Sequence, residues 1–284
     1  MPSKRMDTFR IAVIGDVHSN ILALKASLKS IYDYEARVSC VDIIVFMGDL
    51  LSYGVHPNEV LSEVFELVSL RSTVLLLGNH DQLYLDLVAN SSFDYYNKLP
   101  AWIKESVDLN LKRIDAKLLL SLSFLPYYSC SAALFSHANF FSVDSGPPDW
   151  RYVNTLDDHH QQLKILSQLG FSLGVLGHTH RSRCYTLDPS DFASPSLFCF
   201  DRHINLNARI CLSDYPCSIL NAGSIGQPRE STPLSPTWLL LETDDSTVSA
   251  ATYIPFAYDT NAHLKDISES GLSLHCIHKL LSFF

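Results

Sequence analysis

The 284-residue sequence lacks several features that would assign it to a particular class of protein. Lys and Arg number 21 against 30 Asp and Glu, so the net charge is −9 and nothing suggests the basic stripe that binds nucleic acid. No apolar run reaches the ~18 residues of a membrane span, and residues 1–10 lack the apolar segment of a signal peptide. We therefore expect neither a nucleic-acid partner nor a membrane partner.

The chain also lacks the cysteine pattern of a disulfide framework or a thiolate metal site. Its seven cysteines are odd in number, loosely spaced and without a Cys-x-x-Cys pair. This usage predicts reduced thiols and a cytoplasmic protein. The hydrophobic content of 47% is sufficient for a substantial core, and the length allows one large or two modest domains.

The first third of the sequence alternates between apolar strands and amphipathic helices. Strands are expected at 10–15, 41–47 and 73–77, and helices at 20–32 and 57–70. Strands that alternate with helices in this way imply parallel pairing with right-handed crossovers. Residues 81–125 are mostly helical in pattern and are expected to pack over one rim of the sheet.

The rest of the sequence predicts more strands than helices. Strands at 127–137 and 171–177 flank a helix at 155–169, and the strands beyond residue 180 are expected to build a second, antiparallel-rich sheet at 184–187, 217–220, 237–242 and 248–254. Residues 188–214 are expected to form an irregular insertion, of the kind that often overhangs a site. One domain would then span 1–257, and 258–284 would be a helical extension packed on it or on the partner in a homo-oligomer.

Seven polar residues lie where expected strands end. Five short segments carry them, and each follows an apolar run: Asp16-Val17-His18, Gly48-Asp49, Gly78-Asn79-His80-Asp81, Ser136-His137-Ala138 and Gly177-His178-Thr179-His180. The carboxyl ends of strands in an open α/β sheet converge on one crevice, which is where ligands bind. A polar side chain at such a position does not serve packing, so we expect these residues to form one site.

The residue types in these segments are those that bind divalent metals. Asp16 and His18 are two positions apart, so in an extended chain both can meet one ion. The carboxylate of Asp49 has two oxygens and is the natural bridge between two ions. Oxygen and imidazole ligands together favour Mn²⁺, Fe²⁺, Zn²⁺ or Co²⁺, with Mn or Fe preferred. Two such ions would hold a hydroxide that attacks phosphorus in line.

One histidine of the third segment is free for a different task. His80 follows Asn79 and precedes Asp81, which could hold its imidazole in the tautomer that donates a proton. We therefore expect His80 to protonate the leaving group as general acid and Asp81 to orient it.

These five segments resemble the blocks of the calcineurin-like metallophosphoesterase superfamily, in the same order from Asp16 to His180. The stretch 221–229 also resembles a segment of the small bacterial and archaeal phosphodiesterase-like branch. The resemblance implies an α/β fold, a four-layer α-β-β-α sandwich of two mixed sheets flanked by helices. It also implies two metals, the first held by Asp16, His18 and His180 and the second by Asn79, His137 and His178, with Asp49 bridging.

Departures from the family pattern indicate the class of substrate. Leu77 stands where protein serine/threonine phosphatases carry an arginine, and Gly48 to Gly54 lacks their second one. A phosphoprotein substrate is therefore disfavoured, and small, nucleotide-like phosphodiesters are expected. A phosphomonoesterase, a dinucleoside polyphosphate hydrolase and a non-catalytic scaffold of the same fold are the alternatives.

Substrate contacts are the least specified part of the sequence. Arg181 and Arg229 could bind the phosphate, although a solvated loop charge and a residue that pins a turn explain them equally well. Three aromatic residues could stack on a nucleobase, but their spacing favours core packing: Tyr95, Tyr96 and Trp102.

Overall fold

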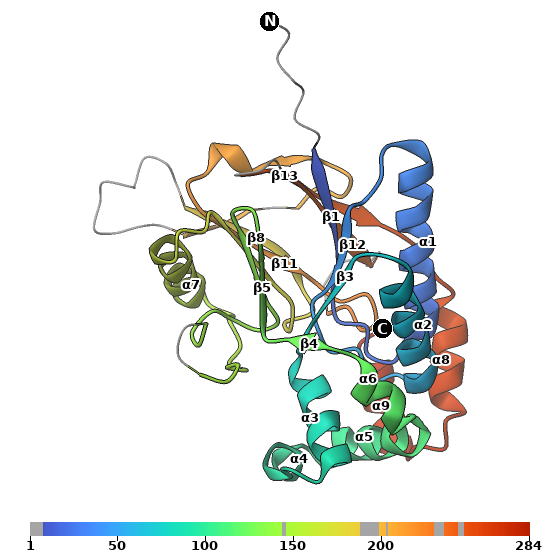
Figure 1. Ribbon diagram of the computed structural model, residues 1–284. Coiled ribbons are helices and arrows are strands. Elements are labelled where there is room, and N and C mark those ends of the chain that lie inside the picture. Colours follow the sequence, from blue (N-terminus) through green and yellow to red (C-terminus); the bar gives the residue numbers. More distant parts are fainter. Residues whose placement is uncertain (1–7, 144–145, 188–198, 203, 230–235, 244–246) are drawn as a thin grey trace, which may run out of the picture.

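The computed structural model describes residues 8–143, 146–187, 199–202, 204–229, 236–243 and 247–284, and these residues form two sheets that lie face to face (Figure 1). Within them, the first sheet has seven strands in the order β10 (Ile210–Cys211), β13 (Val248–Pro255), β12 (Thr237–Thr243), β1 (Phe9–Ile14), β2 (Ile43–Phe46), β3 (Thr73–Leu76) and β4 (Phe124–Leu125). The second has six, in the order β5 (Tyr127–Cys130), β6 (Ala133–Ser136), β7 (Leu173–Leu176), β11 (Ser218–Ala222), β8 (Ser182–Leu187) and β9 (Cys199–Arg202), again counting only described residues. Both sheets mix parallel and antiparallel pairs.

The helices cover the outer faces of the two sheets and one end of the sandwich (Figure 1). On the first sheet lie α1 (Ile21–Arg37), α2 (Pro57–Leu70) and α8 (Thr260–Ser268), and on the second lies α7 (Leu156–Gln168). The end is covered by α3 (Asn79–Ala89), α4 (Asp94–Lys98), α5 (Ala101–Arg113), α6 (Ala116–Ser121) and α9 (Leu274–Leu281).

Alternation along single strands shows why four layers form. Ile11 and Val13 of β1 pack between the sheets against residues such as Phe135, whereas Ala12 and Ile14 pack against α1 and α2. The second sheet repeats the pattern, since its outer face packs on Leu163 and Leu166 of α7. Side chains of a strand point alternately to opposite faces, so each sheet buries both faces. The four-layer α-β-β-α sandwich is confirmed.

The helix boundaries follow from local chemistry. The Asn20 side chain accepts a hydrogen bond from the Ala23 amide and begins α1, and Pro57 occupies the first turn of α2. The first helix continues past the expected residue 32 to Arg37, because its last turn is polar and the apolar periodicity gives no signal there. In that turn Glu35 pairs with Arg71 at 3.0 Å.

The expected membership of the second sheet is wrong. The strands beyond residue 180 do not assemble together: β12 and β13 join the first sheet beside β1, while β8 and β11 join the second beside β7. Residues 237–241 of β12 are all buried, as suits a central strand that is covered on both faces. The strand pattern predicts β structure but does not identify the neighbouring strand.

The expectation for residues 188–214 holds only in part. Residues 188–198 and 203 lie outside the described residues. The described part contains β9, which pairs antiparallel with β8 so that Cys199 lies opposite Leu187. It also contains β10, at the edge of the first sheet. Strand β8 starts at Ser182, close to His180, and ends at Leu187. The irregular insertion at 188–214 stays a prediction where it lies outside the described residues.

The C-terminal segment docks on the body of the protein as expected. Cys276, Ile277 and Leu280 of α9 are buried and pack in one cluster with Tyr53 and Val55. The apolar end of the chain therefore packs intramolecularly. None of the helices that the structure describes has both the length and the apolar character needed to cross a lipid bilayer.

A buried phenol links the two sheets and generates a stability prediction. The Tyr253 hydroxyl of β13 lies 2.9 Å from the Arg183 carbonyl of β8 and 2.9 Å from the Asn221 carbonyl of β11. Tyr253→Phe leaves these buried oxygens without that donor, so we expect a loss of about 1–3 kcal/mol in the free energy of unfolding by urea titration. Tyr32→Phe, at a side chain with 46% exposure, is the matched control and should change stability by less than about 0.5 kcal/mol. Equal effects of the two substitutions would refute the role of the phenol as a link.

Candidate metal centre and active site

The seven expected ligands converge at one end of the sandwich, although they come from both sheets. Asp16 and His18 follow β1, Asp49 follows β2 and Asn79 follows β3, whereas the remaining three follow β6 and β7 of the second sheet: His137, His178 and His180. All seven are buried, with exposed fractions of at most the 4% found for His178. A set of polar side chains that is buried so completely must satisfy its charges internally or with a ligand.

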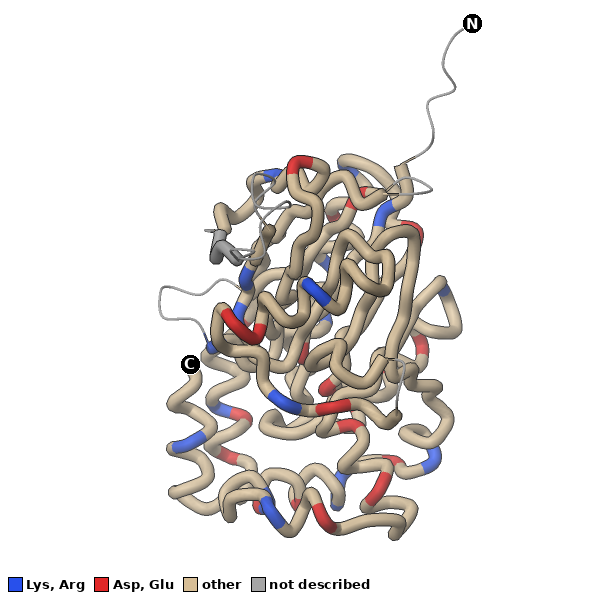
Figure 2. Tube along the Cα trace, turned by 90° about the vertical axis from the view of Figure 1, so that its left-hand side faces the viewer, with Lys and Arg blue, Asp and Glu red and all other residues tan. Residues whose placement is uncertain are grey.

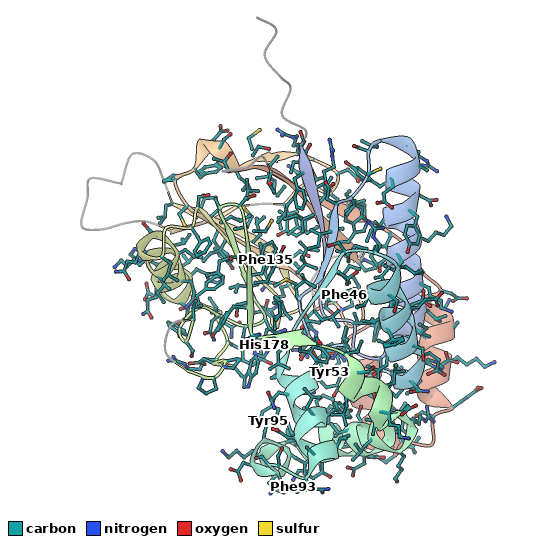
Figure 3. All side chains as sticks on the ribbon, viewed as in Figure 1. Phe46, Tyr53, Phe93, Tyr95, Phe135 and His178 are labelled. Atoms are coloured by element: carbon teal, nitrogen blue, oxygen red, sulfur yellow. The ribbon has the colours of Figure 1, made fainter. Side chains whose placement is uncertain are left out.

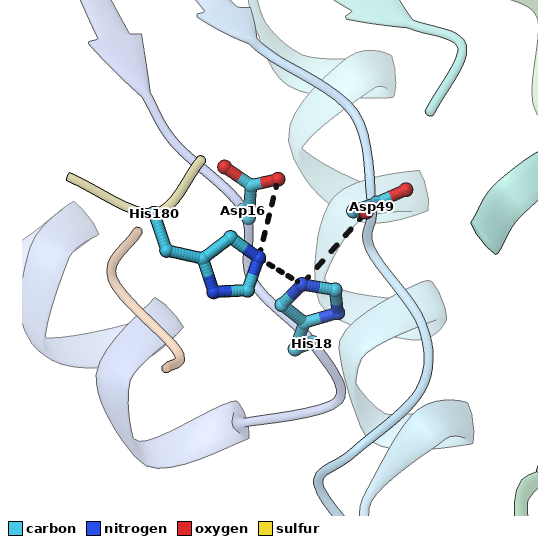
Figure 4. A group of neighbouring side chains, drawn as sticks. All are labelled: Asp16, His18, Asp49 and His180. Atoms are coloured by element: carbon cyan, nitrogen blue, oxygen red, sulfur yellow. Dashed lines mark hydrogen bonds and ion pairs between the residues drawn. The ribbon is translucent and has the colours of Figure 1, made fainter. Parts of the chain in front are cut away.

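The ligand atoms form two groups that share one carboxylate. In the first group, one atom each of Asp16, His18, Asp49 and His180 lies within 4.8 Å of all the others (Figure 4). The second group joins Asp49 to His137 and His178 under the same limit. The oxygen Oδ1 of Asn79 lies 3.1 Å from Nε2 of His137 and so belongs with the second group. The structure thus brings together all seven expected residues, with Asp49 between the two groups.

Each histidine is held by a hydrogen bond from the ring nitrogen that faces away from its group. Carbonyl oxygens accept from Nδ1 in three of them, namely His18 to Leu51 at 2.9 Å, His137 to Met47 at 2.7 Å and His180 to Gln227 at 2.8 Å. In His178 the roles are reversed, since Nε2 lies 3.1 Å from the Trp150 carbonyl. A carbonyl can only accept, so each of these nitrogens carries hydrogen, and the other nitrogen of the ring presents a lone pair whenever the ring is neutral. Such outer contacts are typical of histidines that bind metals.

The positions of His18 and His180 show whether a cation fits between their rings. Their Nε2 atoms lie 2.9 Å apart, and both present lone pairs because both Nδ1 atoms donate to carbonyls. Burial lowers the pKa of His18 to about 3 and lowers that of His180 well below its ordinary value. Neither ring therefore supplies a proton to the gap near neutral pH. A divalent cation with imidazole ligands resolves this repulsion.

The second group also attracts positive charge. Burial lowers the pKa of His137, but Asp49 and then Asp16 outweigh burial and raise it to about 9. Burial raises the pKa of Asp16 to about 7, with His137 acting in the opposite direction. Two buried carboxylates thus bind a proton tightly at this position, and a metal ion would take its place.

Two glycines allow the central carboxylate to approach this closely. Gly48 has a φ of +100°, and a Cβ there would lie 2.6 Å from the Gly78 nitrogen. A Cβ on Gly78 would lie 2.1 Å from Oδ1 of Asp49. Both glycines are therefore required by space, and Gly48 is required by its left-handed conformation as well.

The backbone at the site is strained as well as buried. Four of the expected ligands adopt left-handed conformations that side chains disfavour: His18, Asp49, His178 and His180, with φ of 49°, 53°, 65° and 59°. Left-handed residues that are not glycine cost about 1–3 kcal/mol each and cluster at functional sites.

The expected contact between Asp81 and His80 is wrong. The carboxylate of Asp81 instead accepts backbone N–H groups from Asp49 at 2.7 Å, from Leu50 at 2.9 Å and from Gly78 at 3.1 Å. Adjacent residues at the start of α3 point in different directions, so neighbours in sequence do not become partners. Asp81 ties the loop after β2 to the loop after β3.

Two hydroxyl groups take the place that was expected for Asp81. The Ser52 Oγ lies 2.7 Å from Nδ1 of His80, and the Tyr53 hydroxyl lies 3.1 Å from Nε2. The backbone N–H of His80 donates to Oδ1 of Asp49 at 2.9 Å, which fixes His80 beside both groups of ligands. Burial lowers the pKa of His80, and the Asp49 charge opposes this effect.

Comparison with known proteins agrees with this geometry. Residues 9–182 match the family model described as calcineurin-like phosphoesterase. The chain belongs to this family. Membership implies that phosphoesters are the substrates and makes the two groups of residues a candidate divalent-metal site of a phosphohydrolase.

Relatives cover most of the chain. An uncharacterised protein of Methanocaldococcus jannaschii is 29% identical over 226 residues, which span 78% of this chain and 77% of the relative. A metallophosphoesterase from Sphaerobacter thermophilus has a similar structure, with a TM-score of 0.70, 22% identity and coverage of 97% of this chain and 100% of the other. A hypothetical protein from Pyrococcus horikoshii gives a TM-score of 0.69 at 14% identity, covering 96% and 97%. The two structures share the fold of this phosphoesterase.

Several residues at the site of this phosphoesterase lie outside the five segments. Tyr152 stacks on His178 with ring centroids 4.0 Å apart and is 50% exposed. Tyr95 is 37% exposed and its hydroxyl accepts a hydrogen bond from the Asn79 amide at 2.8 Å, so its expected place in the core is wrong. Figure 3 shows Tyr53, Tyr95 and His178 at this end of the sandwich. In the sequence, the aromatic residues at 93–96 were the one indication that Tyr95 could lie at the site. No sequence pattern indicated Tyr152.

The other two aromatic residues have structural roles. Trp102 stacks on Tyr53 with ring centroids 5.9 Å apart and contacts Phe283, so its expected core packing is found. The Tyr96 hydroxyl donates to Asp108 at 2.8 Å, and the partly buried side chain packs against the core cluster of the first sheet and its helices.

The two arginines considered for phosphate differ in their surroundings. Arg181 is exposed, and its Nε donates to the Arg229 carbonyl at 3.3 Å. The guanidinium of Arg229 lies 5.0 Å from the Phe283 ring centre and 6.0 Å from that of Tyr53. Its Nε is buried and has no hydrogen-bond partner among the described residues. Arg229 is thus held at the site by the C-terminal end of the chain.

The contacts of Asp81 generate a prediction about its role. In Asp81→Asn, the side-chain amide would face backbone N–H donors, so we expect a loss of about 2–4 kcal/mol in unfolding free energy. Displacement of Asp49 should also lower the metal content measured by mass spectrometry. Asp86→Asn, a partly exposed position on the same helix, is the control and should change both quantities little. Normal stability and metal content with lost turnover would instead support an orienting role for Asp81 on His80.

Proposed function

We propose that this phosphoesterase hydrolyses small, nucleotide-like phosphodiesters with two divalent metal ions. The observation that carries the proposal is the pair of ligand groups that share Asp49, with the His80 ring held beside them. Two adjacent cation positions and a neighbouring imidazole are the requirements for hydrolysis of a phosphoester by a general acid.

The residues divide into three tasks. Asp16, His18 and His180 would hold one ion and Asn79, His137 and His178 the other, with Asp49 as the bridge. When bound, the ions supply an activated water and neutralise charge on the phosphoryl oxygens. His80 supplies a proton to the leaving oxygen. An anionic substrate next to its ring favours the protonated form, which opposes the lowering of its pKa by burial.

The charges around the site favour a phosphodiester. Among the described residues, Arg229 is the cationic side chain whose charge acts on His18, His80 and His180. One guanidinium matches the single negative charge of a diester better than the two charges of a monoester. Arg209, by contrast, is paired with Glu242 at 2.8 Å, and Lys and Arg are interspersed with Asp and Glu in Figure 2. On the face drawn there, the described Lys and Arg residues do not gather into the continuous basic band that binds a long nucleic acid.

The rim of the site offers aromatic surface for a base. Tyr152 and Tyr95 are 50% and 37% exposed and lie beside the second ligand group through His178 and Asn79. Exposed aromatic faces stack on nucleobases without regard to sequence. This supports a nucleotide-like substrate over a simple alkyl diester.

The proposal is tested by turnover of bis-p-nitrophenyl phosphate and p-nitrophenyl phosphate with added Mn²⁺. We expect turnover of the diester to require metal and to exceed that of the monoester. Chelation with EDTA should abolish it and Mn²⁺ should restore it. Faster turnover of the monoester would establish a phosphomonoesterase, and no turnover of either would favour a non-catalytic scaffold.

The division of labour predicts different consequences for two neighbouring residues. His80→Ala removes the acid but no ligand, so kcat for a diester whose leaving group needs a proton, such as a phenyl ester, should fall about 10²–10⁴-fold with metal content unchanged. Asp49→Asn weakens the shared ligand, so both ions should be lost together. Loss of both ions in His80→Ala would contradict these roles.

The surroundings of the two arginines predict which one binds phosphate. Arg229→Gln should lower kcat/KM for the diester about 10–100-fold, because a charge-assisted hydrogen bond to the phosphate is lost. Arg181→Gln is the matched control and should lower it less than about threefold, since Arg181 is exposed. The reverse ranking would show that Arg181 is the phosphate contact.

A further inference from the structure

The hydroxyl groups around His80 define where protons can move. The Ser52 Oγ, 2.7 Å from Nδ1 of His80, also donates to the Tyr84 hydroxyl at 3.3 Å. The Tyr53 hydroxyl, 3.1 Å from Nε2, lies on the opposite side of the ring. The imidazole therefore lies between two hydroxyl groups, and neither of its nitrogens faces open space.

A count of hydrogens shows which group faces the substrate. When His80 carries both ring protons, Nδ1–H donates to Ser52, whose own hydrogen goes to Tyr84. Nε2–H donates to the Tyr53 oxygen, which leaves the Tyr53 hydrogen without an acceptor in the described part of the chain. A hydroxyl that accepts one hydrogen bond and still has a free hydrogen is suited to donate to an incoming oxygen.

The ring of Tyr53 lies against the first group of ligands. Its centroid is 4.6 Å from that of His18 and 6.5 Å from that of His180, and the Arg229 guanidinium lies 6.0 Å from it. The phenol therefore lies beside the same ligands as the His80 ring, whose centroid is 5.5 Å from that of His18. Because Nε2 of His80 faces the Tyr53 oxygen, its proton leaves the ring through that oxygen unless Tyr53 moves.

The backbone that carries these hydroxyls is strained. Ser52 and Tyr53 are consecutive left-handed residues, with φ of 79° and 63°. Such residues are strained, and they persist only where the surroundings impose them. The surroundings here are specific: Ser106 accepts the Tyr53 N–H at 3.1 Å, and Trp102 stacks on its ring. The strain places one hydroxyl on each side of the His80 ring.

We propose that Tyr53 is a catalytic residue that passes the proton of His80 to the leaving oxygen. The inference rests on the proposed hydrolysis of phosphodiesters. The oxygen of the attacking water forms a bond to phosphorus as the bond between phosphorus and the leaving oxygen breaks, and the electron pair of the broken bond remains on the leaving oxygen. The leaving oxygen takes the Tyr53 hydroxyl proton, while the Tyr53 oxygen takes the Nε2 proton along the 3.1 Å hydrogen bond. His80 becomes neutral and regains a proton from water after the alcohol has left.

The test compares two diesters that differ only in the leaving group, thymidine 5′-p-nitrophenyl phosphate and thymidine 5′-phenyl phosphate. p-Nitrophenolate leaves without protonation, whereas phenolate needs it. In Tyr53→Phe we expect kcat to fall about 10²-fold or more for the phenyl ester and less than about threefold for the p-nitrophenyl ester. An equal loss for both esters would show that the phenol is only structural.

Two further variants make the comparison specific. Tyr96→Phe removes a phenol hydroxyl that contacts Asp108 instead of His80, so it should leave the ratio of the two rates unchanged. The double variant Tyr53→Phe/His80→Ala should be no slower with the phenyl ester than His80→Ala alone, because a relay fails once when either member is lost. If the rate loss of the double variant equals the product of the losses of the two single variants, the relay is overturned.

A measurement on the unmodified protein covers the case in which Tyr53→Phe does not fold or does not bind metal. For the phenyl ester, kcat in mixtures of H₂O and D₂O should vary quadratically with the deuterium fraction, because two protons move together. A linear dependence would overturn the relay. No metal-dependent turnover of the p-nitrophenyl ester by the unmodified protein would instead refute the proposed function itself, so the two failures are distinguishable.

Discussion

The carboxylate of Asp81 is the constraint on which the rest of the site depends. Its two oxygens accept the N–H groups of Gly78, Asp49 and Leu50, so it joins the loops that follow β2 and β3. The strained conformation of Asp49 is held in this way, and Asp49 in turn accepts the N–H of His80. Burial and then the Asp49 charge raise the pKa of Asp81 to about 7, so these bonds are charge-assisted, and the anchor is strongest, above that pH. Asp49 and His80 are therefore both positioned through the side chain of Asp81.

The site is built at the expense of stability. Buried carboxylates, facing imidazole lone pairs and left-handed ligands all oppose folding, as the pKa of about 7 for Asp16 and the pKa of about 3 for His18 reflect. The two sheets offset this cost with apolar layers on both faces of each sheet, and carbonyl groups of Leu51, Met47 and Gln227 hold the rings. Divalent ions would convert the remaining repulsion into ligation, so metal binding and stability are coupled in this fold.

The sequence identifies the two groups of candidate ligands well because each ligand is marked by the residues next to it in the chain. A polar residue directly after an apolar strand is defined by three or four neighbouring letters, as for Asp49 after β2, and the fold then brings such residues together. Partners that depend on side-chain direction are not local. Asp81 adjoins His80 in sequence but points to the backbone of Asp49, while Ser52 and Tyr53 reach His80 from 28 and 27 positions away. The sheet neighbours of β12 were unpredictable for the same reason, since long-range pairing leaves no periodic signal.

The residues at the rim of the site come from other parts of the chain than the candidate metal ligands. Tyr152 lies on a loop that Asn139 fixes, since its amide donates to the carbonyls of Asp149 and Arg151 at 2.9 Å each. Arg229 is held by Phe283, so the helical segment at the C-terminal end contributes to a site whose ligands all precede residue 181. Loops and terminal segments tolerate change, because few core contacts depend on them. On the proposed function, the same candidate ligands serve different phosphoesters when these outer residues differ, and Tyr152, Tyr95 and Arg229 select the substrate instead of the five segments.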